Sequence, residues 1–165
     1  MGIVALYVFL IPLVFIFIPG SLNYNFAYDK LALAIMAIAC VFFAIFIWRF
    51  KKFSDFKFST VFKAALYGLI FAFPEETIFR GIIQGFFQAQ YSNPAIAILL
   101  SSLVFGIAHL PNGAKSFNSR DWNWKFAAVA FLAGLPLGLM FALTQSLLLS
   151  ILLHILFTMY IKLVE

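Results

Sequence analysis

Long apolar stretches are the feature that most constrains the fold of this chain. They follow one another along the sequence at 3–18, 31–48, 60–88, 95–110, 124–143 and 147–164. A helix that crosses a bilayer needs about 20 mostly apolar residues. Hydrophobic residues make up 65% of the 165 residues and charged residues 10%, against about 45–50% and about 25% in soluble domains. We therefore predict an all-α fold, a polytopic membrane helical bundle of about six transmembrane helices.

The densest run of charge divides the chain into two parts. It lies at 49–57 and carries one arginine and three lysines. We predict a single integral-membrane domain over 1–165, in which 1–57 form two accessory helices and a basic loop and 58–165 form a four-helix core. No basic residue precedes the first apolar stretch and no small-residue cleavage site follows it. We therefore expect that stretch to be a retained helix rather than a cleaved signal peptide.

The distribution of basic residues predicts the topology. Besides 49–57, the loop between the fourth and fifth stretches carries Lys115 and Arg120, whereas the other loops hold almost no basic residue. Basic loops are typical of the cytoplasmic side, so both termini are expected in the cytoplasm. The net charge of +5 does not indicate nucleic-acid binding. These residues lie beside apolar stretches, where they act as topology signals and contact membrane lipid.

A few strongly ionisable side chains lie well inside the apolar stretches. They are Glu75, Glu76, Arg80, His109 and His154. A charged group at bilayer depth costs several kcal/mol, so such residues mark a functional site by default. Buried charges must also be paired. We therefore expect these side chains, which come from three different stretches, to converge.

Their spacing predicts which side chains meet. Glu76 and Arg80 are four residues apart and can form an ion pair on one helix face. Glu75 lies about 100° around the helix from Glu76 and is left to face another helix.

Two further residues have the same four-residue spacing from the histidines. Phe105 can pack beside the imidazole of His109, and Thr158 is expected to place its hydroxyl next to the imidazole of His154.

Two features of the third stretch predict local departures from a regular helix. Pro74 removes one helical hydrogen bond and is expected to kink or break the helix just before the two glutamates. Gly81 and Gly85 form a pair of small residues four apart, which is typical of a close approach between helices.

On the residues alone, a carboxylate and two imidazoles have three possible uses. Glu75 can act as a general base on water while a histidine helps to stabilise the oxyanion. Glu75, His109 and His154 also match the ligand set of a catalytic zinc ion. A proton relay is the third use. Each histidine can also serve as a hydrogen bond between helices, and the joint occurrence of these groups favours a site.

Three motifs carry a resemblance to a known family. Glu75-Glu76-x-x-x-Arg80, Phe105-x-x-x-His109 and His154 in the last stretch resemble those of the CPBP family. This is the CAAX-protease and bacteriocin-processing (Abi) group of intramembrane proteases, related to the type II CAAX prenyl endopeptidases. The resemblance covers 58 to the C-terminus. It implies an intramembrane endopeptidase of a bacterial or archaeal cytoplasmic membrane, with 58–165 as its catalytic core.

The resemblance also implies a role for each motif residue. Glu75 would activate water with His109, Glu76 and Arg80 would orient the first motif, and His154 would contribute to the oxyanion site. The substrate would be a protein or peptide cut near its C-terminus or a transmembrane segment. We favour a glutamate-dependent mechanism without a cofactor, with Zn²⁺ as the alternative. A shared water requires the side chains of Glu75 and His109 to lie within about 8 Å of each other. We also expect the site to lie in a cavity that opens to the cytoplasmic side.

One position departs from the family pattern. Thr158 stands where the family commonly has an asparagine that serves as a second oxyanion donor, and its hydroxyl would take that place. The departure also motivates an alternative function, a catalytically silent membrane binding or immunity protein of the same fold. A proton-coupled carrier that uses the Glu and His groups is the further alternative.

Overall fold

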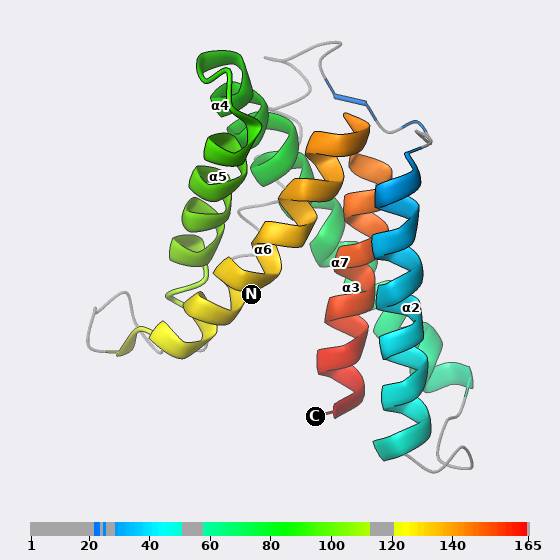
Figure 1. The fold of residues 1–165 in the computed structure, drawn as a ribbon. Coiled ribbons are helices and arrows are strands. Elements are labelled where there is room, and N and C mark those ends of the chain that lie inside the picture. The colour runs from blue at the N-terminus through cyan, green and yellow to red at the C-terminus, as the bar shows by residue number, and fades with distance from the viewer. Residues whose placement is uncertain (1–21, 24, 26–28, 51–57, 113–120, 165) are drawn as a thin grey trace.

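The computed structural model describes residues 22–23, 25, 29–50, 58–112 and 121–164, and their regular structure is entirely helical (Figure 1). The helices are α2 (Lys30–Phe50), α3 (Phe58–Glu76), the π-helix η2 (Thr77–Gln84), α4 (Gly85–Gln90), α5 (Pro94–Ala108), α6 (Trp124–Thr144) and α7 (Leu147–Val164). The predicted all-α class is confirmed. The first predicted stretch, 3–18, and most of the basic loop lie outside the described residues.

Local signals in the sequence set several helix ends. Asn93 caps α5 by accepting a hydrogen bond from the backbone N–H of Ala95, with Pro94 in the first turn. Asn123 caps α6 in the same way, at 3.0 Å from the backbone nitrogen of Phe126. Asparagine is favoured at such caps because its side-chain oxygen satisfies an N–H that has no partner within the helix. The predicted fifth and sixth stretches therefore match α6 and α7 almost residue for residue.

The third predicted stretch is helical from Phe58 to Gln90, but its irregular part is not where the sequence placed it. Helix α3 continues through Pro74 to Glu76, and the backbone then changes to the π-helix η2. The helix therefore does not break before the glutamates, and the alternative of a kink at Pro74 stays a prediction. A proline removes one backbone hydrogen bond, which a helix tolerates when neighbouring helices pack against it. The hydroxyl of Thr77 donates to the carbonyl of Phe73 at 2.7 Å where the two helix types join.

Glycines mark the closest helix crossings. A Cβ atom on Gly106 of α5 would lie 2.9 Å from the Cβ of Phe131 on α6, and one on Gly68 of α3 would lie 3.3 Å from Ile155 on α7. Both substitutions would push neighbouring helices apart, because ordinary Cβ contacts are longer than this. The pairs α5–α6 and α3–α7 are accordingly the most extensive contacts among the described helices.

The predicted close approach of helices at the glycine pair is not found among the described helices. A Cβ on Gly81 would collide with the side chain of Leu22, which lies outside the helices, and would lie 3.4 Å from the side chain of Leu147 on α7, which is ordinary contact. At Gly85 the nearest atom to such a Cβ would be 3.9 Å away, the backbone oxygen of Arg80, which is ordinary contact.

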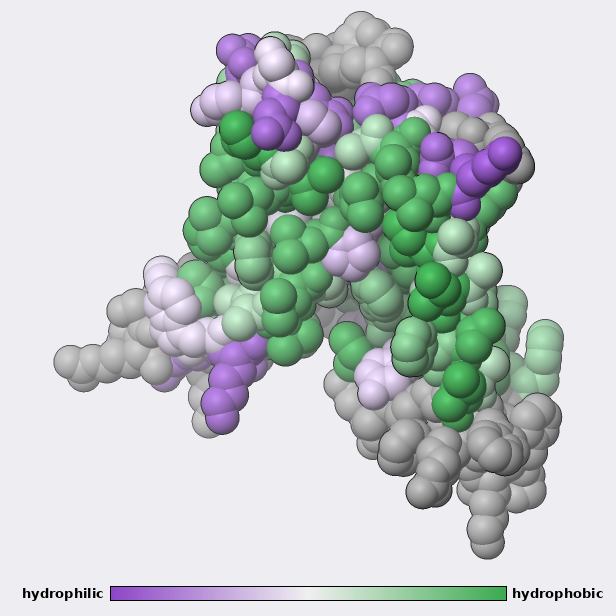
Figure 2. Space-filling view, viewed as in Figure 1, coloured by the Kyte–Doolittle hydropathy of each residue, from purple (hydrophilic) through white to green (hydrophobic). Residues whose placement is uncertain are grey.

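The helices expose an apolar band between more polar ends (Figure 2). In Figure 1 the start of α2, the α4–α5 connection and the α6–α7 turn lie at one end of the molecule. The start of α3, the start of α6 and the C-terminus lie towards the other. By length and composition, α6 is the one helix in the described ranges that is long and apolar enough to cross a bilayer. Shorter apolar helical stretches are 30–45, 94–108 and 147–163. Six crossings remain a prediction.

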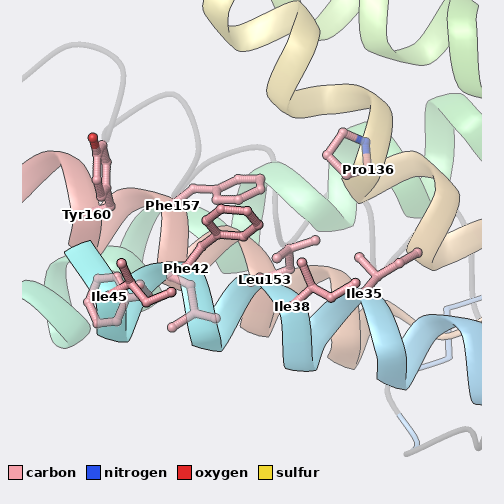
Figure 3. A pocket seen from close by; sticks show the side chains of 11 residues that line it. Ile35, Ile38, Phe42, Ile45, Pro136, Leu153, Phe157 and Tyr160 are labelled. Atoms are coloured by element: carbon pink, nitrogen blue, oxygen red, sulfur yellow. The ribbon is translucent and has the colours of Figure 1, made fainter. Parts of the chain in front are cut away.

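An apolar pocket of about 590 Å³ lies between α2, α6 and α7 (Figure 3). Its lining includes Ile38 and Phe42 of α2, Pro136 of α6, and Leu153 and Phe157 of α7. None of the site residues predicted from the sequence lines it.

Candidate active site

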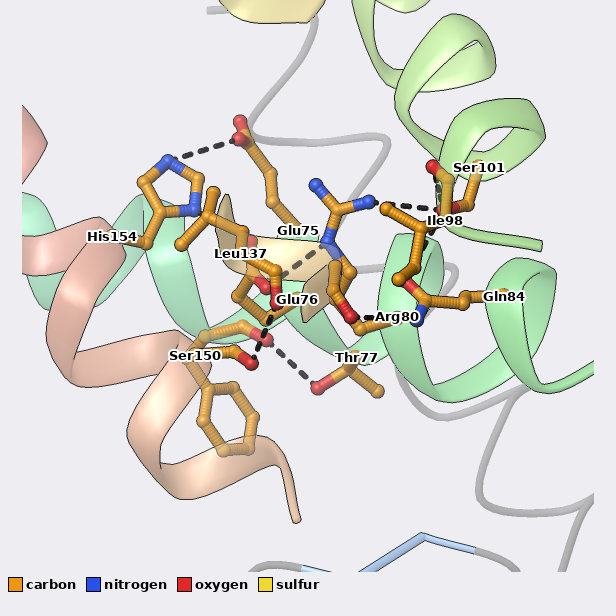
Figure 4. A network of polar contacts seen from close by, with 12 residues as sticks. Glu75, Glu76, Thr77, Arg80, Gln84, Ile98, Ser101, Leu137, Ser150 and His154 are labelled. Atoms are coloured by element: carbon orange, nitrogen blue, oxygen red, sulfur yellow. Dashed lines mark hydrogen bonds and ion pairs between the residues drawn. The ribbon is translucent and has the colours of Figure 1, made fainter. Parts of the chain in front are cut away.

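The end of α3 and the π-helix η2 bring two glutamates and an arginine into the interior (Figure 4). Glu76 and Arg80 are fully buried, and Nε of Arg80 lies 3.3 Å from Oε2 of Glu76. This confirms the ion pair that the four-residue spacing predicted. Glu75 faces residues of other segments, as expected: its Oε2 lies near His109 and His154, and its side chain is only 7% exposed.

His154 of α7 lies between the two carboxylates. Its Nδ1 is 2.8 Å from Oε1 of Glu76, and its Nε2 is 3.6 Å from Oε2 of Glu75. An ionised carboxylate only accepts hydrogen bonds, so the short contact to Glu76 places a hydrogen on Nδ1. The other ring nitrogen, Nε2, is therefore the atom that faces Glu75.

His109, at the C-terminal end of α5, presents the same ring nitrogen to the same oxygen. Its Nδ1 lies 2.8 Å from the carbonyl oxygen of Phe105, and its Nε2 is 3.7 Å from Oε2 of Glu75. Because a carbonyl oxygen is also an acceptor only, Nδ1 carries the hydrogen here too. The ring of Phe105 packs on the imidazole with 4.4 Å between centroids. The predicted Phe105–His109 contact is confirmed.

Oε2 of Glu75 is thus the point at which three segments meet. It lies within 3.7 Å of Nε2 of both His109 and His154. This is well inside the limit of about 8 Å that a shared water requires. A neutral imidazole with its hydrogen on Nδ1 has a lone pair on Nε2, and a carboxylate has only lone pairs. The three atoms therefore repel one another unless a hydrogen-bond donor or a cation lies among them.

The hydroxyl of Thr158 makes a hydrogen bond within its own helix. Its Oγ1 donates to the carbonyl oxygen of His154 at 3.1 Å. A hydroxyl has one hydrogen to donate, so the hydrogen of Thr158 is used within α7 rather than directed at the imidazole. The expectation that this hydroxyl lies next to the imidazole of His154 stays a prediction.

Sequence reasoning missed three buried polar side chains on the far side of Arg80. Ser101 lies 3.3 Å from Nη1 of Arg80, Gln84 lies 3.1 Å from the Ser101 hydroxyl, and Ser102 is equally buried beside them. A search restricted to ionisable residues passes over serine and glutamine. A search for neutral polar residues inside apolar stretches would have found them, since a buried polar group must find a hydrogen-bond partner.

The donor atoms around Glu75 are of the types found in catalytic zinc sites, two imidazole nitrogens and a carboxylate oxygen. However, the part of the chain that the structure describes contains no group of three or more His, Cys, Asp or Glu side chains arranged to hold a metal ion.

Comparison with known proteins gives one match. The family model described as type II CAAX prenyl endopeptidase Rce1-like matches residues 57–160. The match covers more than half of the chain. It includes the cluster around Glu75, which consists of Glu75, Glu76, Arg80, His109 and His154. No curated protein and no solved structure matches the chain.

Proposed function

This chain belongs to the Rce1-like family of type II CAAX prenyl endopeptidases, and we propose that it is an intramembrane endopeptidase that uses Glu75 to activate water. The family is one of membrane-bound proteases, so its substrates are proteins. The observation that carries the proposal is the position of Oε2 of Glu75, 3.7 Å from Nε2 of His109 and 3.6 Å from Nε2 of His154.

The first step is the activation of water between Glu75 and His109. Two acceptor atoms 3.7 Å apart can both lie about 2.8 Å from one water oxygen. The water then directs one hydrogen at Oε2 of Glu75 and the other at Nε2 of His109. Glu75 takes its proton as the oxygen attacks the carbonyl carbon of the scissile peptide bond, which is general-base catalysis. His109 orients the water.

His154 is suited to stabilise the oxyanion that this attack produces. Its Nδ1–H is held by Glu76, so Nε2 points towards Glu75 and the proposed attacking water, a region that we call the reaction space. As an imidazolium with Glu76 as its counter-ion, His154 donates Nε2–H to the oxyanion. The proton on Glu75 then passes to the leaving amine, the C–N bond breaks, and the products are a carboxylic acid and an amine. Arg80 balances the charge of Glu76.

The positions of the helix ends support a proposed arrangement in the membrane. The start of α3, the start of α6 and the C-terminus lie towards one end of the molecule (Figure 1), and the basic segments of the sequence adjoin these ends. This supports a cytoplasmic C-terminus, and six crossings with both termini in the cytoplasm remain part of the proposal. His109 follows α5 on the side where α6 begins, which supports a site that opens towards the cytoplasm. The substrate would be cut near its C-terminus or next to a transmembrane segment.

The division of the chain into accessory and catalytic parts has similar support. The residues of the cluster come from α3, η2, the end of α5 and α7, while α2 packs against α7 and α6 and contributes none of them. We propose 58–165 as the catalytic core and 1–57 as accessory.

The experiment that tests the function is a Glu75→Gln substitution in protein reconstituted into liposomes. The probes are a prenylated CAAX peptide and a membrane-anchored peptide without a prenyl group, incubated in H₂¹⁸O. Mass spectrometry of the new C-terminus reports both cleavage and attack by water. We expect Glu75→Gln to lower the cleavage rate by about 10²–10⁴-fold, the usual contribution of a general base.

An exposed carboxylate supplies the matched control. Asp121 is exposed, and Asp121→Asn removes the same charge outside the cluster, so its cleavage rate should equal that of the wild type. Full cleavage by Glu75→Gln would show that the proposed mechanism is wrong.

One observation favours a second candidate, a catalytically silent binding or immunity protein of the same fold. The hydrogen of the Thr158 hydroxyl is used within α7, so the cluster lacks the second oxyanion donor that the asparagine of the family pattern would supply. This candidate predicts that the wild-type protein incorporates no ¹⁸O into either probe and that its biological function survives Glu75→Gln.

A further inference from the structure

A second line of polar side chains runs from Arg80 away from the reaction space to the backbone of α6 (Figure 4). Nη1 of Arg80 donates to Oγ of Ser101 at 3.3 Å, and Oγ of Ser101 lies 3.1 Å from Oε1 of Gln84. Nε2 of Gln84 then donates to the carbonyl oxygen of Gly138 at 2.8 Å. The side chains of Arg80, Ser101 and Gln84 are fully buried. The line therefore connects the cluster to a helix that contributes no side chain to it.

We propose that Ser101 and Gln84 are positioning residues, which hold the guanidinium of Arg80 and thereby the imidazole of His154. The connection runs from Arg80 to Oε2 of Glu76 at 3.3 Å, and from Oε1 of Glu76 to Nδ1 of His154 at 2.8 Å. The catalytic consequence rests on the proposed function, whereas the effect on the imidazole can be measured without any cleavage.

Few contacts orient the guanidinium of Arg80, so the hydrogen bond to Ser101 has a large share in holding it. The guanidinium is planar and rigid, so contacts at two of its nitrogens fix the plane. Nε is in ion-pair contact with Glu76 but forms no hydrogen bond with it, Nη1 donates to Ser101, and Nη2 has no hydrogen-bond partner among the described residues. The ring of Phe105 lies 5.2 Å from Cζ, which restrains the face of the group but not its rotation in the plane. Without the Ser101 hydroxyl, the one hydrogen bond to the outer nitrogens is lost.

Gln84 in turn holds the hydroxyl of Ser101, and Gly138 leaves space for the Gln84 side chain. The hydroxyl of Ser101 has acceptors at 3.1 Å in both Oε1 of Gln84 and the carbonyl of Ile98. A Cβ on Gly138 would lie only 2.9 Å from Oε1 of Gln84, so the glycine allows the amide to reach the α6 backbone. The π-helix η2 carries both Arg80 and Gln84, and π-helical segments are frequent at functional sites.

The neighbouring serine is a matched control. Ser102 is also fully buried, and its Oγ has no hydrogen-bond partner in the described part of the protein. Ser101→Ala and Ser102→Ala thus remove the same atom from adjacent positions of one helix, and only the first breaks the line to Arg80.

The test reads the histidine rings directly. The chain contains two histidines, so selective ¹⁵N labelling of the full-length protein in micelles gives two sets of ring signals, assigned with a His109→Gln variant. Ring ¹⁵N shifts report which nitrogen carries hydrogen. We expect Ser101→Ala to move the His154 signals and leave those of His109 in place, while Ser102→Ala moves neither. Equal spectra for the two serine variants would overturn the proposal.

Cleavage rates provide the second readout. We expect Ser101→Ala to lower kcat about tenfold with KM changed less than about twofold, since small misplacements of catalytic groups reduce kcat strongly. Gln84→Met, which removes the amide at similar length, should act in the same direction and replaces Ser101→Ala if that variant does not fold.

A wild-type protein that cleaves neither probe while Ser101→Ala still moves the His154 signals would refute the proposed function and leave the positioning role intact. Unchanged signals in Gln84→Met and in any folded Ser101→Ala would refute the positioning role.

Discussion

Helix α7 has two faces that meet different surroundings, although the residues concerned are neighbours in sequence. His154 faces the carboxylates of α3, and each of its two ring nitrogens lies close to one carboxylate oxygen. Leu153, next to it, packs against α2 and α6 and lines the apolar pocket of about 590 Å³ (Figure 3). The comparison shows that the polar face demands specific atoms, whereas the apolar face demands only a filled volume.

The two kinds of surroundings differ in how they respond to substitution. Removing one partner of a buried ion pair leaves the other charge without compensation. Shortening a buried apolar side chain leaves a cavity but no uncompensated charge, and the loss depends on how far the neighbours can relax. Substitutions on the two faces of α7 and on its neighbours can therefore separate stability from catalysis.

The largest effect is expected from Arg80→Met. This substitution removes the guanidinium paired with the buried carboxylate of Glu76 and leaves it only the contact with His154, and we expect the free energy of unfolding to fall by about 3–5 kcal/mol, with loss of cleavage. The measurement is denaturant unfolding in mixed micelles. Lys63→Met is the matched control, because Lys63 is exposed on α3 and its loss should change stability by less than about 0.5 kcal/mol. A loss below about 1 kcal/mol for Arg80→Met would contradict the importance of the pair.

Leu153→Ala should destabilise the protein almost as much and yet spare catalysis. Leu153 is 1% exposed, and a buried Leu→Ala substitution costs about 2–5 kcal/mol. Leu152→Ala, at a position that is 41% exposed, should cost far less. We expect kcat of folded Leu153→Ala to stay within about twofold of the wild type, because the partners of His154 are on the other face. A large fall in kcat would show that the two faces of α7 are coupled.

The sequence predicted those parts of the site that local spacing determines. The pairing of Glu76 with Arg80 and of Phe105 with His109 follows from residues four apart on one helix, and both contacts are present. The convergence of His154 with these residues followed from the cost of an unpaired charge in an apolar interior. The all-α class followed from the apolar stretches, which are about as long as helices that cross a bilayer.

What the sequence did not predict depends on packing between helices. The change to π-helical geometry at Thr77 has no signal in residue spacing, because the spacing argument assumes a regular α-helix. The contact of Gln84 with Gly138 joins residues far apart in the chain. For Thr158, spacing places the residue on the right face but does not decide whether its hydroxyl bonds to the imidazole or to the backbone. Serine and threonine often make the second choice within helices.

Alanine substitutions at two glycines are expected to change the free energy of unfolding by smaller amounts and in opposite directions. A Cβ at Gly138 would lie 2.9 Å from Oε1 of Gln84, whereas a Cβ at Gly85 has its nearest neighbour at 3.9 Å. We expect Gly138→Ala to lower the free energy of unfolding by about 1–3 kcal/mol through overpacking. Gly85→Ala should raise it by up to about 1 kcal/mol, because alanine favours the helix. Unfolding in mixed micelles measures both, and equal effects would mean that the Gln84 side chain adapts to the added methyl group.

The smallest effect is expected from chelation, and it sharpens the comparison between the two faces. The polar face offers three donor atoms around Glu75, His109 and His154, whereas the pocket lining is apolar. If Glu75 acts as a general base on water, cleavage of the liposome probes should be unchanged after treatment with a chelator. Metal analysis of the purified protein should then find less than one zinc per chain. Loss of cleavage that Zn²⁺ restores in the wild type, and not in His109→Gln, would instead make these three side chains metal ligands. A metal ion held there would supply the activation of the attacking water, and His154 could no longer donate Nε2–H to the oxyanion, because that nitrogen would bind the metal.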